Sequence, residues 1–218
     1  MQKKYTNKLI ILIAFIFTLN NAFSKKVEGY IVTNTADTVY GEIRVSRFNM
    51  SSSGIVLFGI NLEPFFSTVR FRQKGESQFR TYSFDEVSHF SFTYKSTEYK
   101  FDKFEITTRS LVKSEEIRIA FLNLIYSGEV KLYQEIRRAQ STNLSTNGKS
   151  IAYSNYYLYS TKQNLCKVEQ TKAYEKLADL LSVFEIDPKF IQLLPYETKF
   201  KDINAVLLSY DTWKETFL

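Results

Sequence analysis

Residues 29–45 read GYIVTNTADTVYGEIRV, and the organisation of the chain follows from them. Strand-forming β-branched and aromatic residues occupy Tyr30 to Thr33 and Thr38 to Val45, and turn-forming residues lie between them, from Asn34 to Asp37. In the second run apolar and polar residues alternate, as they do along a strand with one buried face. The segment therefore predicts a β-hairpin with an apolar face, which needs further sheet beside it.

The N-terminal segment, residues 1–24, has the composition of a secretory signal peptide. Lys3, Lys4 and Lys8 precede an apolar run of 11 residues, and Ala22-Phe-Ser24 provides a small-x-small cleavage site. A bilayer-spanning helix needs about 20 apolar residues, so we expect cleavage after Ser24 and no stable transmembrane anchor afterwards. The predicted location is the periplasm or the extracellular space. Retention of the segment as an anchor is the alternative.

The composition of residues 25–218 predicts a single domain that relies on its hydrophobic core. The chain contains 19 Phe and 15 Tyr, and its one cysteine, Cys166, allows no internal disulfide. Without the three lysines of the signal segment, 26 of the 29 basic residues are left against 23 acidic residues. This small excess, interleaved with acids, argues against a nucleic-acid partner.

Hydrophobic periodicity predicts a β-rich part, residues 25–169, and a helical part, residues 170–218. Beyond the hairpin, strands are predicted at 54–59, 69–74, 79–82, 89–94, 98–107, 129–137, 152–160 and 165–169. One helical turn is predicted at 83–87. A short helix is predicted at 120–127, because its apolar residues have helical spacing and Gly128 suits a helix end. The small polar residues of 139–150 predict a mobile loop.

The helical part has recognisable start signals. Thr171 and Thr198 are candidate N-caps, and Asp187-Pro188 predicts a helix start with Pro at the first position. The residues expected to pack on the sheet are Leu177, Leu181, Ile203, Leu207 and Trp213. Strands followed by helices predict an α+β fold: mainly an antiparallel β sheet or bent β-roll with a C-terminal helical segment packed on it.

Several short motifs are similar to those of a known group of proteins. They are Gly29-Tyr30-Ile31, Asp37-Thr38 with Gly41, and Phe121-Leu122 followed by Gly128 and Leu132-Tyr133. In these motifs the chain resembles uncharacterised exported α+β proteins of Bacteroidota, which usually have Gly where this chain has Ala36. The resemblance implies export and the fold class. It implies no activity, because the family has none assigned.

No motif for catalysis or for metal binding is evident. His89 and Cys166 are the only residues of their types, and their separation gives no zinc-ligand spacing. Ser88 and Asp85 do not form a triad with His89, because neighbours on a strand point to opposite faces. The acids considered as members of a glycosidase pair, which nothing in the sequence brings together, are Asp37, Glu42, Asp85 and Glu86. We predict that the protein is not an enzyme and holds no cofactor or metal.

Tyrosine is the residue type that predicts a binding surface. Its flat apolar ring and polar tip suit a sugar or a protein surface, although tyrosines on a wet sheet also shield cross-strand neighbours. The candidate binding residues are Tyr40, Tyr94, Tyr99, Tyr156, Tyr157 and Tyr159.

Three functional readings follow from the sequence. We expect an exported, non-catalytic interaction or structural protein of the cell envelope, whose partner is an envelope protein or a glycan. The alternative is a ligand-binding module that holds a glycan or peptide on the tyrosine-rich sheet face. The third and least favoured reading is a hydrolase of unrecognised type.

Overall fold

The computed structural model describes residues 24–46, 49–51, 54–56, 60–108, 116–140, 150–168 and 174–217. Its strands are β1 (Ser24–Thr33), β2 (Thr38–Ser46), β3 (Asn49–Ser51), β4 (Gly54–Val56), β5 (Thr68–Gln73), β6 (Arg80–Ser83), β7 (Val87–Tyr94), β8 (Thr97–Thr108), β9 (Glu116–Tyr126), β10 (Lys131–Gln140), β11 (Ser150–Tyr159) and β12 (Cys166–Val168). The α-helices are α2 (Tyr174–Val183), α3 (Pro188–Leu193) and α4 (Ile203–Phe217), and the 3-10 helices are η1 (Glu63–Phe66) and η3 (Phe200–Asp202).

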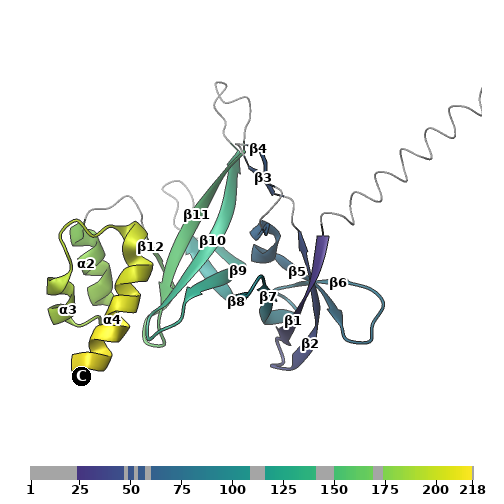
Figure 1. Cartoon of the computed structure of the whole chain (residues 1–218), viewed down its shortest axis with the longest axis horizontal. Coiled ribbons are helices and arrows are strands. Elements are labelled where there is room, and N and C mark those ends of the chain that lie inside the picture. The colour runs from purple at the N-terminus through teal and green to yellow at the C-terminus, as the bar shows by residue number, and fades with distance from the viewer. Residues whose placement is uncertain are drawn as a thin grey trace, which may run out of the picture. The chain divides into compact units, whose positions relative to one another are not determined.

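The strands form a large antiparallel sheet. They hydrogen-bond in the order β12-β11-β10-β9-β8-β7-β1-β2-β5-β6, while β3 and β4 make a separate pair, and the helices follow at the C-terminal end (Figure 1). This confirms the predicted α+β class, mainly antiparallel sheet with a C-terminal helical segment. Of the predicted signal segment only Ser24 is described, as the first residue of β1. Most of the predicted 139–150 loop lies outside the described residues.

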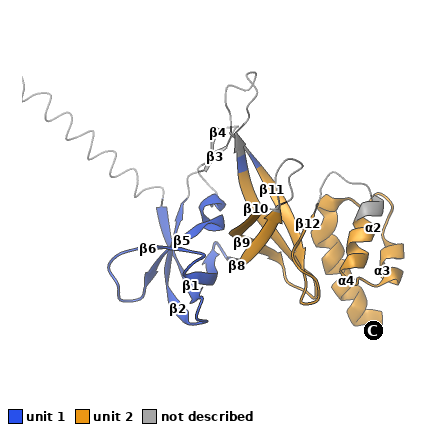
Figure 2. Cartoon of the chain, turned by 180° about the vertical axis from the view of Figure 1, so that it is seen from behind, with its two compact units in different colours: residues 1–98, 138–152 blue, residues 99–137, 153–218 orange. Residues whose placement is uncertain are grey.

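The chain divides into two compact units (Figure 2). Unit 1 comprises residues 1–98 and 138–152, and unit 2 comprises residues 99–137 and 153–218. The first contains β1, β2, β5, β6 and β7, and the second contains most of β8 to β12 together with the helices. Each unit has buried apolar side chains of its own.

In unit 1 the predicted hairpin is confirmed. β1 and β2 pair antiparallel from Ser24 opposite Ser46 to Val32 opposite Thr38. The turn between them places Ala36 at a φ of 66°, in the left-handed region. A hydrogen bond of 3.0 Å from the Ala36 N–H to the Thr33 carbonyl closes this turn.

The core of unit 1 lies on one side of its strands. The fully buried members from β1, β2, β5 and β7 are Ile31, Ile43, Val45, Val69, Phe71, Val87, Phe90 and Phe92. Phe65, from the 3-10 helix η1, packs its ring 5.8 Å from Phe90 and 5.0 Å from Phe92, measured between centroids. The predicted alternation of β2 and β5 is therefore confirmed.

Two glycines allow close approach within this sheet. Gly29 and Gly41 face each other across β1 and β2. A Cβ on Gly41 would overlap the Arg72 carbonyl and the Phe71 ring, and one on Gly29 would overlap the Ser91 carbonyl. Any side chain larger than hydrogen would therefore push these strands apart.

The predicted helical turn at 83–87 is wrong. Phe84, Asp85 and Glu86 form a tight turn between β6 and β7, closed by a 3.1 Å hydrogen bond from the Glu86 N–H to the Ser83 carbonyl. The Ser83 hydroxyl accepts from the Asp85 N–H at 3.2 Å, as it would at a helix start. The chain does not continue as a helix, because Val87 already belongs to β7 and is buried in the core.

The predicted helix at 120–127 is also wrong, because these residues belong to β9. Residues 116–123 pair in register with residues 101–108 of β8, for example Ala120 with Phe104. Phe121 and Leu122 are both fully buried although they point to opposite faces. A strand buried on both faces loses the alternation that would identify it.

The helices of unit 2 cover one face of its strands. The core between them joins Val130, Leu132, Leu158 and Val168 to Leu177, Leu181, Phe190, Ile203, Leu207 and Tyr210, with Trp213 partly buried against it. The predicted packing of the helical part is therefore confirmed. Asp187 caps α3 as predicted, accepting from the Lys189 N–H at 2.7 Å. Thr198 is not a cap, because η3 begins after Lys199, whose N–H donates to Asp202.

Gly128 serves the docking of α4 rather than a helix end. A Cβ at this position would overlap Oδ2 of Asp211, which accepts a hydrogen bond from the Tyr126 hydroxyl. A larger residue here would force the Asp211 and Tyr126 side chains to move, because α4 approaches the turn between β9 and β10 closely.

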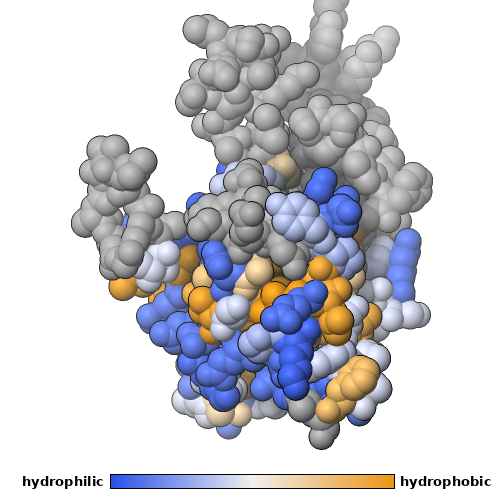
Figure 3. Space-filling view, turned by 90° about the vertical axis from the view of Figure 1, so that its left-hand side faces the viewer, coloured by the Kyte–Doolittle hydropathy of each residue, from blue (hydrophilic) through white to orange (hydrophobic). Residues whose placement is uncertain are grey.

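The outer surface of the helices mixes apolar and charged side chains. Figure 3, which looks onto the side where the helices lie, shows hydrophobic patches between hydrophilic ones. Exposed apolar residues on the helices are Val183, Leu193, Leu208 and Phe217. In the part of the chain that the structure describes, no helix is both long enough and apolar enough to span a bilayer.

Candidate functional site

The outer face of unit 1 carries polar and aromatic side chains in cross-strand rows. We define the outer face as Lys26, Glu28 and Tyr30 of β1, Tyr40, Glu42 and Arg44 of β2, and Arg70 and Arg72 of β5. These residues alternate with the buried core residues, so they point away from the core. The register places Lys26 opposite Arg44, Glu28 opposite Glu42 and Tyr30 opposite Tyr40. Arg72 lies opposite Glu42 on the other side of β2.

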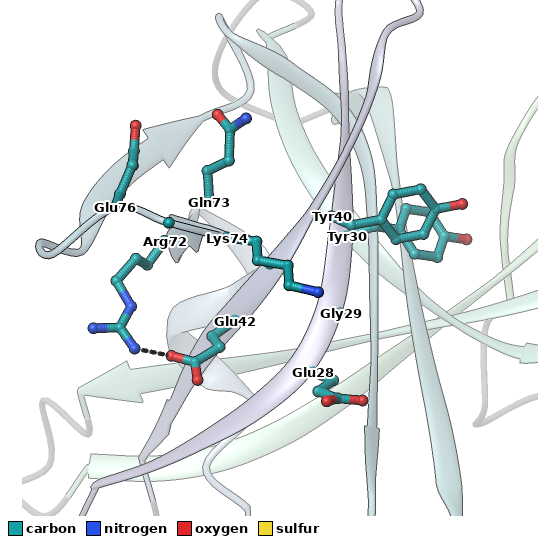
Figure 4. Close-up of a pocket in the computed structure, with 11 residues that line it drawn as sticks. Glu28, Gly29, Tyr30, Tyr40, Glu42, Arg72, Gln73, Lys74 and Glu76 are labelled. Carbon is teal, nitrogen blue, oxygen red and sulfur yellow. Dashed lines mark hydrogen bonds and ion pairs between the residues drawn. The ribbon is translucent and has the colours of Figure 1, made fainter.

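A groove of about 570 Å³ opens on this face (Figure 4). We call it the charged groove. It is lined by Glu28, Gly29, Tyr30, Tyr40, Gly41, Glu42, Arg72, Gln73, Lys74, Gly75 and Glu76. These residues come from β1, β2, β5 and the turn after β5, where Gly75 has a φ of 95°. The volume lies within the range of small-molecule sites, about 300–1,000 Å³.

A pair of tyrosines forms the aromatic end of the groove. The Tyr30 and Tyr40 rings lie side by side in Figure 4, with centroids 5.8 Å apart and ring planes inclined by 53°. Tyr30 is positioned by the neighbouring strand β7, because its hydroxyl and His89 Nε2 share a hydrogen bond of 3.1 Å. Tyr40 is 69% exposed, so the face of its ring is available to a ligand.

The charged side chains of the groove are only partly matched to one another. Arg72 points to Glu42 and forms an ion pair with it (Figure 4). The side chains of Glu28, Lys74 and Glu76 make no ion pair or hydrogen bond with any residue that the structure describes. The groove therefore presents carboxylate acceptors and an ammonium donor that are unpaired beside an exposed ring.

The two glutamates of the groove do not have the environment of a glycosidase pair. A glycosidase acid is kept protonated in an apolar site. Glu28 is exposed, and Glu42 is paired with Arg72. The two residues also stand directly opposite each other on one sheet face, so both lie on the same side of any bound molecule.

The other acids considered from the sequence lie in turns. Asp37 accepts from the Thr35 hydroxyl at 2.8 Å in the β1–β2 turn. Asp85 accepts from the Ser83 hydroxyl, and Glu86 pairs with Arg80. These acids stabilise local structure.

His89, Ser88 and Cys166 are not brought together. Ser88 donates its hydroxyl to the carbonyls of Val32 and Thr33, both at 3.2 Å, while His89 contacts Tyr30 on the outer face. Cys166 is a half-buried thiol in β12, and its Sγ contacts the Lys167 carbonyl at 3.8 Å. Among the described residues no group of three or more His, Cys, Asp or Glu side chains is placed to hold a metal ion.

The six predicted tyrosines are distributed over several environments. Only Tyr40 lies in the charged groove. Tyr94 is buried in unit 1, and Tyr99, at the start of unit 2, is half-buried. In unit 2, Tyr156 packs against the core under the helices, whereas Tyr157 and Tyr159 belong to the cluster on the opposite sheet face. Tyr157 is only 2% exposed, so it offers almost no surface to a partner.

Unit 2 contains an ion pair with a buried carboxylate and a guanidinium that is 23% exposed, which the sequence did not indicate. Arg118 of β9 donates two hydrogen bonds to Glu135 of β10, at 2.8 and 2.7 Å. The hydroxyl of Tyr157 in β11 donates to Glu135 at 3.0 Å, and Glu135 is 3% exposed. Burial, together with this carboxylate, raises the pKa of Tyr157 above its usual range. Because both Glu135 oxygens already accept hydrogen bonds, the cluster joins three strands and presents no reactive carboxylate.

Five of the groove's charged and aromatic side chains were missed by sequence reasoning: Glu28, Tyr30, Arg72, Lys74 and Glu76. Their assembly depends on β5 pairing with β2, and those strands are far apart in sequence. The Tyr30–Tyr40 and Glu28–Glu42 pairs did leave a signal, because a hairpin closed at Asn34 to Asp37 sets them opposite each other.

Comparison with known protein families, with curated proteins and with solved structures finds no match to this chain.

Proposed function

We propose that this protein is an exported, non-catalytic binding protein of the cell envelope or the extracellular space, and that it holds a saccharide in the charged groove of unit 1. The observation that carries the proposal is a groove of about 570 Å³ in which charged side chains, unpaired within the described part of the chain, lie beside the exposed ring of Tyr40. Export is supported by the composition of residues 1–24.

Recognition in this groove depends on side chains. β1 lies between β7 and β2, and β2 lies between β1 and β5, so the main-chain groups along the groove floor are used in the sheet. A peptide cannot add to these strands as a further strand, which is one established way for a sheet to bind an extended chain. The groove therefore favours a ligand that is held by its own polar groups.

The side chains that line the groove suit hydroxyl groups on a ring. Carboxylates such as Glu28 accept hydrogen bonds, and Lys74 donates them. Tyr40 offers an apolar ring face on which the carbon-bound hydrogens of a sugar can rest, with a polar tip at its edge. A saccharide has both kinds of surface on each residue.

Binding of oligosaccharides by the exported protein is the direct test. We expect isothermal titration calorimetry to detect saturable binding of at least one of cellohexaose, xylohexaose and chitohexaose. Tyr40→Ala should weaken that binding by about tenfold or more, equivalent to about 1.4 kcal/mol, because it removes the stacking surface.

The matched control is Tyr196→Ala, which removes a tyrosine of similar exposure (72%) from unit 2. It should leave the affinity unchanged. Equal loss in both variants, or no saturable binding of any of the three sugars, would count against the proposal. Release of new reducing ends during incubation would favour the hydrolase reading instead.

A further inference from the structure

Three cationic side chains of unit 1 surround a single aromatic ring. Phe79 lies in the segment between β5 and β6. Its ring centroid is 5.9 Å from Lys26 Nζ, 4.7 Å from Arg44 Cζ and 4.9 Å from Arg72 Cζ. We call these four residues the Phe79 cluster. Arg72 also lines the charged groove, so the cluster and the groove adjoin.

Two of these cations have no anionic partner among the residues that the structure describes. Arg72 pairs with Glu42, but Lys26 and Arg44 make no described ion pair or hydrogen bond through their side chains. They stand directly opposite each other on β1 and β2. Like charges in this position repel, and contact with a ring recovers only part of that energy.

One buried donor of the cluster has no acceptor. Nε of Arg44 is buried and has no hydrogen-bond partner in the described part of the chain. Buried donors in native proteins are almost always satisfied, so an unsatisfied one calls for an explanation such as a ligand. Arg70 adds a further positive charge on the same face, two residues before Arg72 in β5.

We infer that the Phe79 cluster binds an oxyanion carried by the ligand of the charged groove, with Lys26 and Arg44 as its cationic partners. The inference rests on the proposed function, because it places the oxyanion on the same saccharide. A planar guanidinium beside an ammonium suits a carboxylate, a sulfate ester or a phosphate ester. The preferred ligand is therefore an acidic sugar, and a neutral saccharide binds the same groove more weakly.

Four monosaccharides with one ring and different substituents test the inference. Glucose, glucuronate, glucose 6-sulfate and glucose 6-phosphate are each titrated into the ¹⁵N-labelled protein at constant ionic strength, and the amide shifts are followed by NMR. At least one acidic sugar should bind about tenfold or more tightly than glucose, because hydrogen bonds to a charged group are stronger than neutral ones. The tightest of the three identifies the oxyanion.

Charge-matched variants separate a site from general attraction. Lys26→Gln combined with Arg44→Gln should remove the preference for the acidic sugars. Lys167→Gln combined with Lys189→Gln removes the same amount of charge from exposed positions of unit 2, and this variant should keep the preference for acidic sugars. If the first double variant does not fold, the wild-type protein provides the test. The amide chemical-shift changes caused by the acidic sugar must then be largest at and around Lys26, Arg44 and Phe79.

The outcomes distinguish this inference from the proposed function. If glucose and the acidic sugars bind equally tightly at Tyr40, the saccharide groove stands and the oxyanion site is refuted. An equal loss of preference in both double variants also refutes it. Acidic sugars that bind at Lys26 and Arg44, when neutral hexasaccharides do not bind, support the oxyanion site and refute a groove for neutral sugars. Absence of saturable shifts with all four sugars counts against both.

Discussion

Ala36 has a backbone conformation that glycine adopts more readily. Its φ of 66° brings Cβ close to the carbonyl that follows, which costs a residue with a side chain about 1–2 kcal/mol. Its side chain is exposed, so little packing depends on the methyl group. The residue is therefore a source of strain in the β1–β2 turn.

We predict that Ala36→Gly raises the free energy of unfolding by about 0.5–1 kcal/mol, because relief of this strain exceeds the entropy that glycine adds to the unfolded chain. Urea denaturation measures the change. Ala205→Gly, at an exposed position in α4, is the matched control and should lower stability by about 0.5–1 kcal/mol. A loss of stability in both variants would show that the turn does not strain Ala36.

Among the elements, β9, β10 and β11 are joined through a side-chain cluster as well as through their main chains. Glu135 accepts hydrogen bonds from Arg118 and Tyr157 while almost completely buried. Removing one member of such a pair leaves the other charge without a counter-charge. Replacing both members with apolar residues leaves no unpaired charge.

We predict that Glu135→Gln lowers the free energy of unfolding by about 3 kcal/mol, because Arg118 keeps its charge and loses its partner. Glu185→Gln makes the same chemical change in the exposed Lys162–Glu185 pair and should cost less than about 1 kcal/mol. Thermal or urea unfolding of both variants provides the comparison.

The double variant Arg118→Met with Glu135→Leu completes this test. It should recover part of the stability lost in Glu135→Gln, because no buried charge is left unpaired, although the buried Tyr157 hydroxyl loses its acceptor. A double variant less stable than Glu135→Gln would mean that the ion pair makes a net stabilising contribution to unit 2. The loss in Glu135→Gln would then not be due only to the unpaired charge of Arg118.

The elements also show which parts of the fold can be predicted from sequence. The β1–β2 hairpin and β5 were predicted, since one face of each is buried and the other polar, and α3 was predicted from Asp187-Pro188. β9 was not, because both of its faces are buried around Phe121 and Leu122 and the alternation disappears.

The charged groove could be predicted only in part. The hairpin register implies the Tyr30–Tyr40 and Glu28–Glu42 pairs once the turn is located. Arg72 and Lys74 join them through the pairing of β5 with β2, and no local pattern encodes that long-range choice. The high tyrosine content predicted an aromatic binding surface, but it could not distinguish the buried Tyr157 from the exposed Tyr40.

At the scale of the whole molecule, the ionisation of tyrosines links stability to pH. Burial, together with a neighbouring carboxylate, raises the pKa of Tyr126 to about 12 and raises the pKa values of Tyr133 and Tyr157 further above the usual value of about 10. The partner carboxylates are Asp211, Asp102 and Glu135. All of these groups belong to unit 2.

We predict that these tyrosines make the protein less stable as the pH rises above about 10. The folded state holds the three protons more tightly than the unfolded state, so their contribution is complete below pH 10 and declines between pH 10 and 12. Each buried tyrosine contributes a slope of up to about 1.4 kcal/mol per pH unit, and the partly exposed Tyr126 contributes less.

Urea unfolding midpoints between pH 8 and pH 12 measure this decline. Tyr133→Phe should make the decline shallower, because one of the protons lost on unfolding is then absent. Tyr196→Phe, at an exposed position, should leave the slope unchanged. A midpoint that stays level to pH 12 would show that the three phenols are not held protonated by the fold.

Trp213 has an optical consequence for a chain with two compact units. It is the only tryptophan, and it lies half-buried in α4 with ring centroids of Phe190, Tyr210 and Phe217 at 5.8, 6.1 and 5.6 Å. Fluorescence excited selectively in tryptophan therefore reports the helical layer of unit 2, whereas far-ultraviolet circular dichroism reports the strands of both units. Loss of the two signals at different denaturant concentrations would reveal that the units melt independently, and a single coincident transition would reveal that they melt together.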